Sequence, residues 1–283
     1  MAGMTRALVL GGGGVTGIGW ELGLLLGLQD LGVDLTDADT VVGTSAGSVV
    51  GAQVTGGRSL VDLYAQQLAD PSGEIAASLG RLTMLTYAVL LLTPGRSSTR
   101  RRRLGRASVR AARRPTAVPE EERVRVIRDR LPGDVWPDRD LRVTTVDADT
   151  GAFVVLDRSG DVDLVHAVAA SCAVPLVWPP VTVGGHRYVD GGVRSGTNAD
   201  VAAGARRIVV VAPLPRALSR RQSVAAQLER TGASATAVVS PNAAALAAIG
   251  RNVLDPARRA GAARAGRAQA ASVAERVRAA WQG

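Results

Sequence analysis

The sequence has no lysine, one cysteine and two histidines, and only 3% of its residues are aromatic. A single cysteine, Cys172, excludes a framework of internal disulfide bonds. With His166 and His186 as the only histidines, the chain lacks the ligand clusters typical of zinc sites, and we expect no metal and no other cofactor. The scarcity of aromatic residues disfavours a surface that stacks nucleic-acid bases, so we expect no nucleic-acid partner.

Because lysine is absent, arginine supplies all 34 basic residues, against 25 acidic ones. Nine of these arginines lie between Gly95 and Arg114, a segment without an acid, so the other 25 arginines balance the 25 acids. The net charge of +9 therefore comes from this one segment. Pro94 and Pro115 bound the segment as an insertion or linker, and its composition indicates either contact with an anionic surface or a solvated, disordered loop.

No apolar run of the sequence reaches the length of about 20 residues that a membrane span needs. The most apolar stretch, residues 79–93, is shorter and contains Arg81, so we expect a buried or interfacial helix there. Together with the arginines that follow, residues 79–114 are expected to contact an anionic membrane peripherally. The apolar run at 7–10 is too short for a secretory signal, which predicts a non-secreted, cytoplasmic protein.

Strands and helices alternate along the first part of the chain, as in an α/β fold. Residues 7–10 form an expected strand, residues 18–31 an apolar helix, residues 40–43 a second strand and residues 45–56 a helix of small residues. Further along the chain we expect helices that begin near Ser59 and Pro119, a hairpin that joins 141–146 to 152–156, and a buried strand at 208–212.

We divide the chain at residue 215. Residues 1–215 are expected to form the α/β domain, interrupted by an apolar and arginine-rich insertion at 79–118. Residues 216–283 are rich in alanine and arginine and are expected to form a helical layer. At 283 residues and 46% apolar content, the chain is long and apolar enough for a sizeable packed core.

The first expected strand leads into a loop that is almost entirely glycine, "LGGGGVTG". Gly12, Gly14 and Gly17 fit the G-x-G-x-x-G spacing, in which bare backbone and a helix N-terminus approach a pyrophosphate. The same backbone could instead stabilise the oxyanion of an acyl-transfer reaction, because both ligands need converging N–H groups without side chains in the way. The loop alone leaves both interpretations open.

The second expected strand enters "GTSAG", which matches G-x-S-x-G and leads into a helix. In this setting glycines permit a cramped turn that exposes the hydroxyl of Ser45 as a nucleophile. A serine nucleophile needs a base, but both histidines precede Asp190, so the chain order Ser, Asp, His is absent. We expect His166 to be a core or supporting residue and His186 a turn residue. Asp190, in "YVDGG", could serve as the base of a Ser-Asp dyad if it is partly desolvated.

Three segments in this order, "LGGGGVTG", "GTSAG" and "ASCAVPLVWPPVTVGGHRYVDGG", resemble the patatin-like phospholipase family. That family has a glycine-rich oxyanion loop, a G-x-S-x-G nucleophile and a D-G-G or D-G-A aspartate. The resemblance runs from about Ala7 to Pro213 and is weakest between residues 57 and 140. It implies a three-layer α/β fold with a central, mostly parallel sheet flanked by helices.

By this resemblance Ser45 is the nucleophile and Asp190 is the base of a catalytic dyad. The N–H groups of Gly12, Gly13 and Gly14 would form the oxyanion hole. The implied activity is hydrolysis of fatty-acyl esters of lipids, of the phospholipase A, lysophospholipase or lipase type, through an acyl-enzyme. The remaining glycines of the three motifs are Gly17, Gly43, Gly47, Gly191 and Gly192.

The sequence departs from the family at one position and leaves one alternative. Thr16 stands before the last glycine of the loop, where the family usually has arginine, and this bears on head-group recognition rather than on acyl chemistry. The alternative is a dinucleotide-binding, Rossmann-like protein that uses the loop glycines. Such a fold needs an acid at the end of the second strand, and Asp34 lies at about the right distance. However, only "GV" precedes Asp34, and the apolar strand begins later, at Thr40.

Overall fold

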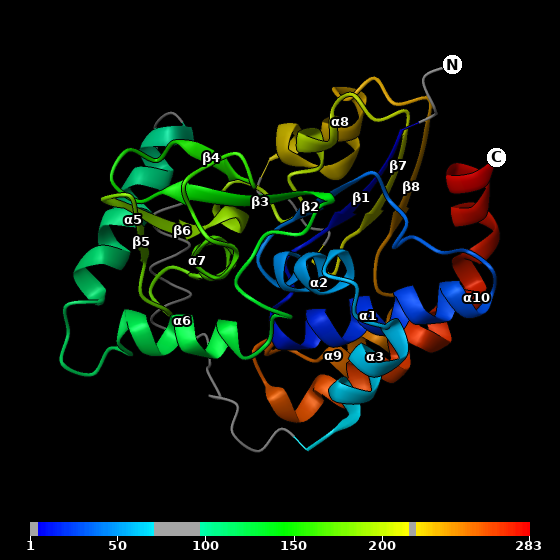
Figure 1. Cartoon of the computed structure of the whole chain (residues 1–283), viewed down its shortest axis with the longest axis horizontal. Coiled ribbons are helices and arrows are strands. Elements are labelled where there is room, and N and C mark those ends of the chain that lie inside the picture. The colour runs from blue at the N-terminus through cyan, green and yellow to red at the C-terminus, as the bar shows by residue number, and fades with distance from the viewer. Residues whose placement is uncertain (1–4, 71–96, 215–218) are drawn as a thin grey trace.

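The computed structural model describes residues 5–70, 97–214 and 219–283, which form an α/β fold around an eight-stranded sheet (Figure 1). The strand order is β5-β6-β3-β2-β1-β7-β8, and β4 pairs with β3. The strands are β1 (Arg6–Leu10), β2 (Thr40–Gly43), β3 (Asp140–Asp147), β4 (Phe153–Leu156), β5 (Val181–Val183), β6 (His186–Asp190), β7 (Arg207–Val211) and β8 (Ala235–Val239).

The helices of the described residues connect and cover these strands. The α-helices are α1 (Gly14–Asp30), α2 (Ala46–Thr55), α3 (Leu60–Leu68), α5 (Ser97–Ala111), α6 (Glu120–Arg128), α7 (Leu164–Ser171), α8 (Val224–Glu229), α9 (Ala243–Ile249) and α10 (Arg259–Gln282). Short 3-10 helices are η1 (Gly191–Val193), η2 (Ala199–Ala202), η3 (Arg220–Gln222) and η4 (Pro256–Arg258).

Five neighbouring strands, β3, β2, β1, β7 and β8, run parallel to one another, as expected from the sequence. The other three pair antiparallel at one end of the sheet, where Thr145 of β3 lies opposite Asp190 of β6. The carboxyl ends of parallel strands share one edge of a sheet, where α/β proteins form their sites. The glycine loop after β1 and the serine loop after β2 therefore meet at this edge.

Helices cover both faces of the sheet, which gives the expected three layers. In β1, Leu8 and Leu10 face one hydrophobic cluster while Ala7 and Val9 face another, and all four are fully buried. Helices α1, α2, α7 and α10 belong to the first cluster, and α8 and η2 to the second. Figure 1 shows α1 and α2 below the sheet, α10 at its lower right, and α8 above it. A strand buried on both sides reads as a continuous apolar run, as "ALVL" does.

The C-terminal segment packs directly on the first helix. Gly23 of α1 lies so close to α10 that a Cβ there would stand 2.0 Å from the carbonyl oxygen of Ala263. Residues 216–283 also contain a strand, β8, which pairs in parallel with β7. The prediction of a helical layer missed this strand, although three of the five residues of "ATAVV" are β-branched and favour a strand.

The arginine segment forms helix α5, so the prediction of a solvated linker was wrong. Leu104 and Gly105 are buried in this helix, and a Cβ at Gly105 would stand 2.3 Å from the carbonyl oxygen of Ala148. Arg101 Nε also donates to the carbonyl oxygen of Gly151 at 2.8 Å. These contacts with the β3–β4 hairpin stabilise a helix that local charge does not predict. The predicted apolar helix at 79–93 lies outside the described residues.

Within the described ranges, no helix combines the length and apolar character that a membrane crossing requires.

Candidate active site

Ser45 occupies a strained turn between β2 and α2. Its backbone has φ 53° and ψ −117°, and positive φ is rare for residues other than glycine. The flanking glycines permit this turn. A Cβ at Gly43 would stand 2.5 Å from the Cα of Ser48, and a Cβ at Gly47 would stand 2.1 Å from the carbonyl oxygen of Leu10. Both glycines of the G-x-S-x-G motif are therefore required, because a side chain at either position would collide with the backbone around the serine.

The glycine loop lies directly against Ser45. A Cβ on Gly12 would stand 3.4 Å from the Cβ of Ser45. The N–H of Gly12 already donates to the carbonyl oxygen of Gly196 at 2.8 Å, which removes Gly12 from the predicted set of oxyanion donors. Among the described residues no acceptor pairs with the N–H groups of Gly13 and Gly14. These two groups, at the N-terminus of α1, are the candidate donors of the loop.

Asp190 ends β6 beside the serine, and its side chain is buried, with 5% exposed. Its Oδ1 accepts the N–H of Gly192 at 2.7 Å. Burial raises the pKa of Asp190 to about 6, although a hydrogen bond with the Ser45 side chain, the N–H of Gly192 and the charge of Arg123 each lower it. The carboxyl group near Ser45 therefore titrates closer to neutrality than an ordinary aspartate.

Asn198 fixes the two loops that carry this pair, and sequence reasoning missed it. The residue is fully buried in a left-handed conformation, φ 49°. Its Nδ2 lies within hydrogen-bond distance of Thr44 Oγ1 (3.1 Å) and Thr144 Oγ1 (3.2 Å). It also lies near the carbonyl oxygens of Gly191 (3.2 Å) and Ser195 (2.9 Å). One amide thereby connects three parts of the fold: the loop after β2, strand β3, and the segment after β6.

The end of α7 supports the serine from the other side. The N–H of Ser45 donates to Ser171 Oγ at 2.9 Å, and the thiol of Cys172 donates to the carbonyl oxygen of Ser45 at 3.3 Å. Burial raises the pKa of Cys172 to about 11, so its thiol stays protonated and acts as a buried donor. Sequence reasoning missed these contacts, because they depend on how the end of α7 packs against the turn that carries Ser45.

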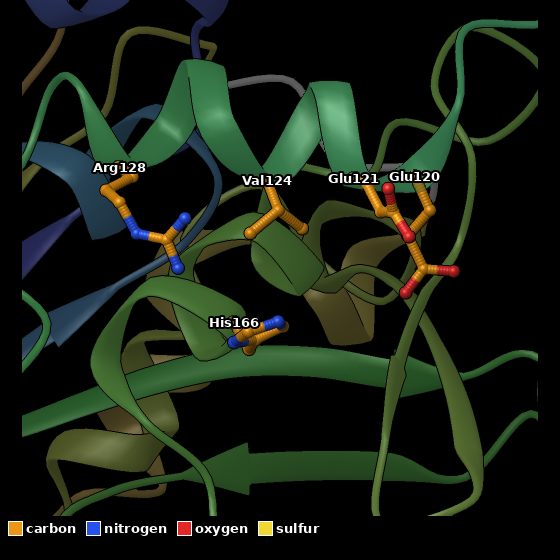
Figure 2. A pocket seen from close by; sticks show the side chains of 5 residues that line it. All are labelled: Glu120, Glu121, Val124, Arg128 and His166. Atoms are coloured by element: carbon orange, nitrogen blue, oxygen red, sulfur yellow. The ribbon is translucent and has the colours of Figure 1, made fainter.

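Neither histidine lies at the candidate site. His166 Nδ1 pairs with Asp163 at 2.7 Å on the first turn of α7 and lines a surface groove of about 410 Å³ between α6 and α7. Neither Ser45 nor Asp190 is among the described residues that line this groove. Figure 2 shows His166 facing the side chains of α6. The expectation of a core position for His166 was wrong, because the helix turns this residue toward solvent. His186 begins β6 after the turn at 184–185.

The described residues contain no group of three or more His, Cys, Asp or Glu side chains that could hold a metal ion.

Comparison with known proteins agrees with this geometry. A family model described as patatin-like phospholipase matches residues 8–203, which is more than half of the chain. The chain belongs to this family. Its members are lipid acyl hydrolases, and this general activity applies to the chain. The matched range contains the glycine loop, the serine turn and Asp190, and it ends before β7.

Two solved structures resemble the chain at low sequence identity. VipD from Legionella pneumophila is 14% identical with a TM-score of 0.47, over 96% of this chain and 67% of that one. ExoU in its heterodimeric complex with SpcU, from the type III secretion system of Pseudomonas aeruginosa, is 19% identical with a TM-score of 0.42. That match covers 99% of this chain and 52% of the other, so the chain spans about half of its length. Comparison with curated proteins gives no match.

The dinucleotide-binding alternative is not favoured. Asp34 lies in the loop before β2, and its carboxylate accepts the N–H of Thr36 at 2.8 Å and Gln29 Nε2 at 3.0 Å. An acid that binds a ribose would instead follow the second strand. In this fold the second strand, β2, leads to Ser45.

Proposed function

We propose that the protein hydrolyses fatty-acyl esters of lipids through a Ser45–Asp190 dyad. The observation that carries this proposal is the strained turn that places Ser45 beside the buried carboxyl group of Asp190, where the serine side chain acts on the pKa of that carboxyl group. Partial desolvation makes the carboxylate a stronger base than an aspartate in water, which suits proton transfer near neutral pH. No histidine is needed for this step.

In the first half of the reaction, Ser45 Oγ attacks the ester carbonyl carbon while Asp190 accepts the hydroxyl proton. The N–H groups of Gly13 and Gly14 then stabilise the negative oxygen of the tetrahedral intermediate. When the intermediate collapses, the bond to the alcohol breaks, and protonated Asp190 returns its proton to the leaving oxygen. The fatty acyl group stays on Ser45 as an ester.

In the second half, a water molecule repeats the attack. The water oxygen bonds to the acyl carbon while Asp190 accepts a proton from the water. The resulting oxyanion accepts hydrogen bonds from the same N–H groups of Gly13 and Gly14. Collapse breaks the ester to Ser45 and returns the proton to Ser45 Oγ, which releases the fatty acid. The same carboxyl group thus serves as base and acid in both halves.

Covalent labelling with a fluorophosphonate tests the proposal. The reagent phosphonylates an activated serine hydroxyl, so we expect one adduct, located at Ser45 by peptide mass spectrometry. The Ser45→Ala variant should not react. A folded wild-type protein that takes up no reagent, or that takes it up at another serine, would contradict the dyad.

We further propose that α5 attaches the enzyme to anionic bilayers. The exposed residues Arg102, Arg106 and Arg110 follow one another at helical spacing on α5, and Arg113 is exposed in the turn just after it. We call these four residues the arginine stripe. Within the described part of the chain, none of the four forms an ion pair with an acid. Each arginine near an anionic surface contributes about 1 kcal/mol of binding free energy.

Replacing all four arginines of the stripe by glutamine should weaken binding to phosphatidylserine vesicles by up to about a thousandfold, because four contributions of about 1 kcal/mol add to about 4 kcal/mol. Binding is measured by flotation, and the wild-type affinity should fall as salt is raised, because exposed charges are screened. A control variant with glutamine at Arg251, Arg264 and Arg276, which are also exposed, should bind as the wild type does. Equal binding of the stripe variant and the wild type would exclude α5 as the attachment surface.

A further inference from the structure

A buried arginine near the candidate dyad has one guanidinium nitrogen without a hydrogen-bonding partner among the described residues. Arg123 of α6 is 6% exposed, and its buried Nε has no partner among the described residues. Its guanidinium carbon lies 4.2 Å from the centre of the Trp178 ring, in a cation–π contact. Burial lowers the pKa of Arg123 to about 10, so the side chain is still charged at neutral pH. Buried charge without a hydrogen-bonded counter-ion is unfavourable, and a bound anion would relieve this cost.

The segment that contains Trp178 also forms hydrogen bonds with the backbone of both members of the dyad. Trp178 follows Cys172 and Ala173 in the connection between α7 and β5. The Cys172 thiol donates to the carbonyl oxygen of Ser45, and the carbonyl oxygen of Ala173 accepts the N–H of Asp190 at 3.0 Å. The positive charge of Arg123 lowers the pKa of both Asp190 and Cys172, and no ion pair between Arg123 and Asp190 occurs among the described residues.

The glycine loop provides no cation of its own. Thr16 is fully buried, and its hydroxyl donates to the carbonyl oxygen of Val253 at 3.2 Å. Among the described residues, Arg123 of α6 supplies the positive charge that acts on Asp190.

We propose that Arg123 binds the phosphate of a glycerophospholipid whose acyl ester lies at Ser45, an inference that rests on the proposed function. A guanidinium presents parallel N–H donors that match two phosphate oxygens, and these bonds are stronger than those between neutral groups. In a glycerophospholipid only the glycerol unit separates the scissile ester from the phosphate. Neutral glycerides lack this group, so Arg123 selects phospholipid or lysophospholipid substrates over them.

A matched pair of substrates tests the proposal. A lysophosphatidylcholine and a monoacylglycerol with the same acyl chain differ only in the phosphocholine group. The measured quantity is the ratio of their kcat/KM values. Arg123→Gln should lower this ratio by about 10- to 100-fold, the effect of one charge-assisted hydrogen-bonded contact. Arg123→Lys should give an intermediate ratio, because a lysine keeps the charge but not the paired donors.

The control is Arg125→Gln on the exposed side of α6, which should leave the ratio unchanged. A ratio in Arg123→Gln equal to that of the wild type overturns the proposal. So does an equal loss on both substrates, because Arg123 would then act on Asp190 or on folding. If inorganic phosphate raises the melting temperature of the wild type but not of Arg123→Gln while the substrate ratio stays constant, Arg123 holds a free anion and the head-group proposal is wrong.

Failure of the proposed function gives a different result. In that case the wild type hydrolyses neither substrate and Ser45 takes up no fluorophosphonate. When both substrates are hydrolysed and Ser45 is labelled, an unchanged ratio refutes the role of Arg123 alone.

Discussion

Replacing Ser45 with alanine is expected to lower kcat/KM for acyl esters by at least about a thousandfold. The variant loses the only proposed nucleophile, while Gly13 and Gly14 can still stabilise an oxyanion formed by direct attack of water. The fold should persist, because alanine fits the same space and strains the turn in the same way as serine. Release of fatty acid from a lysophospholipid, measured with circular dichroism on the same preparations, checks both statements.

A control substitution at a second serine distinguishes the loss of a catalytic hydroxyl group from the loss of a hydroxyl group with a structural role. Ser59 caps α3 and accepts the N–H of Asp62 at 3.2 Å, and it is exposed, unlike the two buried residues of the dyad. Ser59→Ala should destabilise the protein by about 1 kcal/mol and leave kcat/KM unchanged. Ser45→Ala should do the reverse. A Ser45→Ala protein that retains a tenth of the wild-type activity would refute the dyad.

The βαβ unit that carries the serine could be predicted from the sequence because local signals agree along it. The expected strand at 40–43 coincides with β2, and the expected strand at 208–212 with β7, shifted by one residue. Where local signals disagree with tertiary contacts, prediction failed. Helix α5 has a strongly polar sequence, but Gly105 fits against Ala148 and Leu104 is buried, and neither contact can be inferred from the arginines around them.

The residues of the candidate site also fall into those that the sequence could predict and those that it could not. Ser45 and Asp190 could be proposed because their motifs state the chemistry directly. Asn198 lies in "SGTNAD", which reads as an ordinary polar turn, and its role depends on four partners that the fold assembles from distant segments. The commitment of the Gly12 N–H to Gly196 likewise depends on a loop more than 180 residues away. Sequence motifs identify reacting groups, while the groups that position them depend on tertiary structure.

Asp190→Asn is expected to abolish most activity and to stabilise the protein at the same time. The amide keeps an oxygen for the N–H of Gly192 but cannot accept the proton of Ser45, so we expect kcat/KM to fall by at least about a hundredfold. In the wild type, kcat/KM should fall as the pH drops below about 6, where Asp190 becomes protonated. Wild-type activity that stays constant from pH 8 to pH 4 would refute Asp190 as the base.

The stability change follows from the raised pKa of Asp190. An unfolded aspartate ionises near its usual pKa of 3.8, whereas the folded protein holds the proton up to about pH 6, so rising pH favours unfolding between these values. The cost reaches about 3 kcal/mol at higher pH, and asparagine removes it. The free energy of unfolding of Asp190→Asn, from urea titrations, should therefore equal that of the wild type near pH 3 and exceed it above pH 6.

Asp157 provides the control of opposite sign. Its carboxylate accepts the N–H and hydroxyl of Ser159, and these bonds lower the pKa of Asp157 below its usual value. The ionised form therefore stabilises the fold above pH 4, and this stabilisation is lost as the pH falls through the lowered pKa. Asp157→Asn should thus destabilise the protein at neutral pH, where Asp190→Asn stabilises it. If both variants shift stability in the same direction with pH, burial of Asp190 does not penalise its charge, and the dyad loses its physical basis.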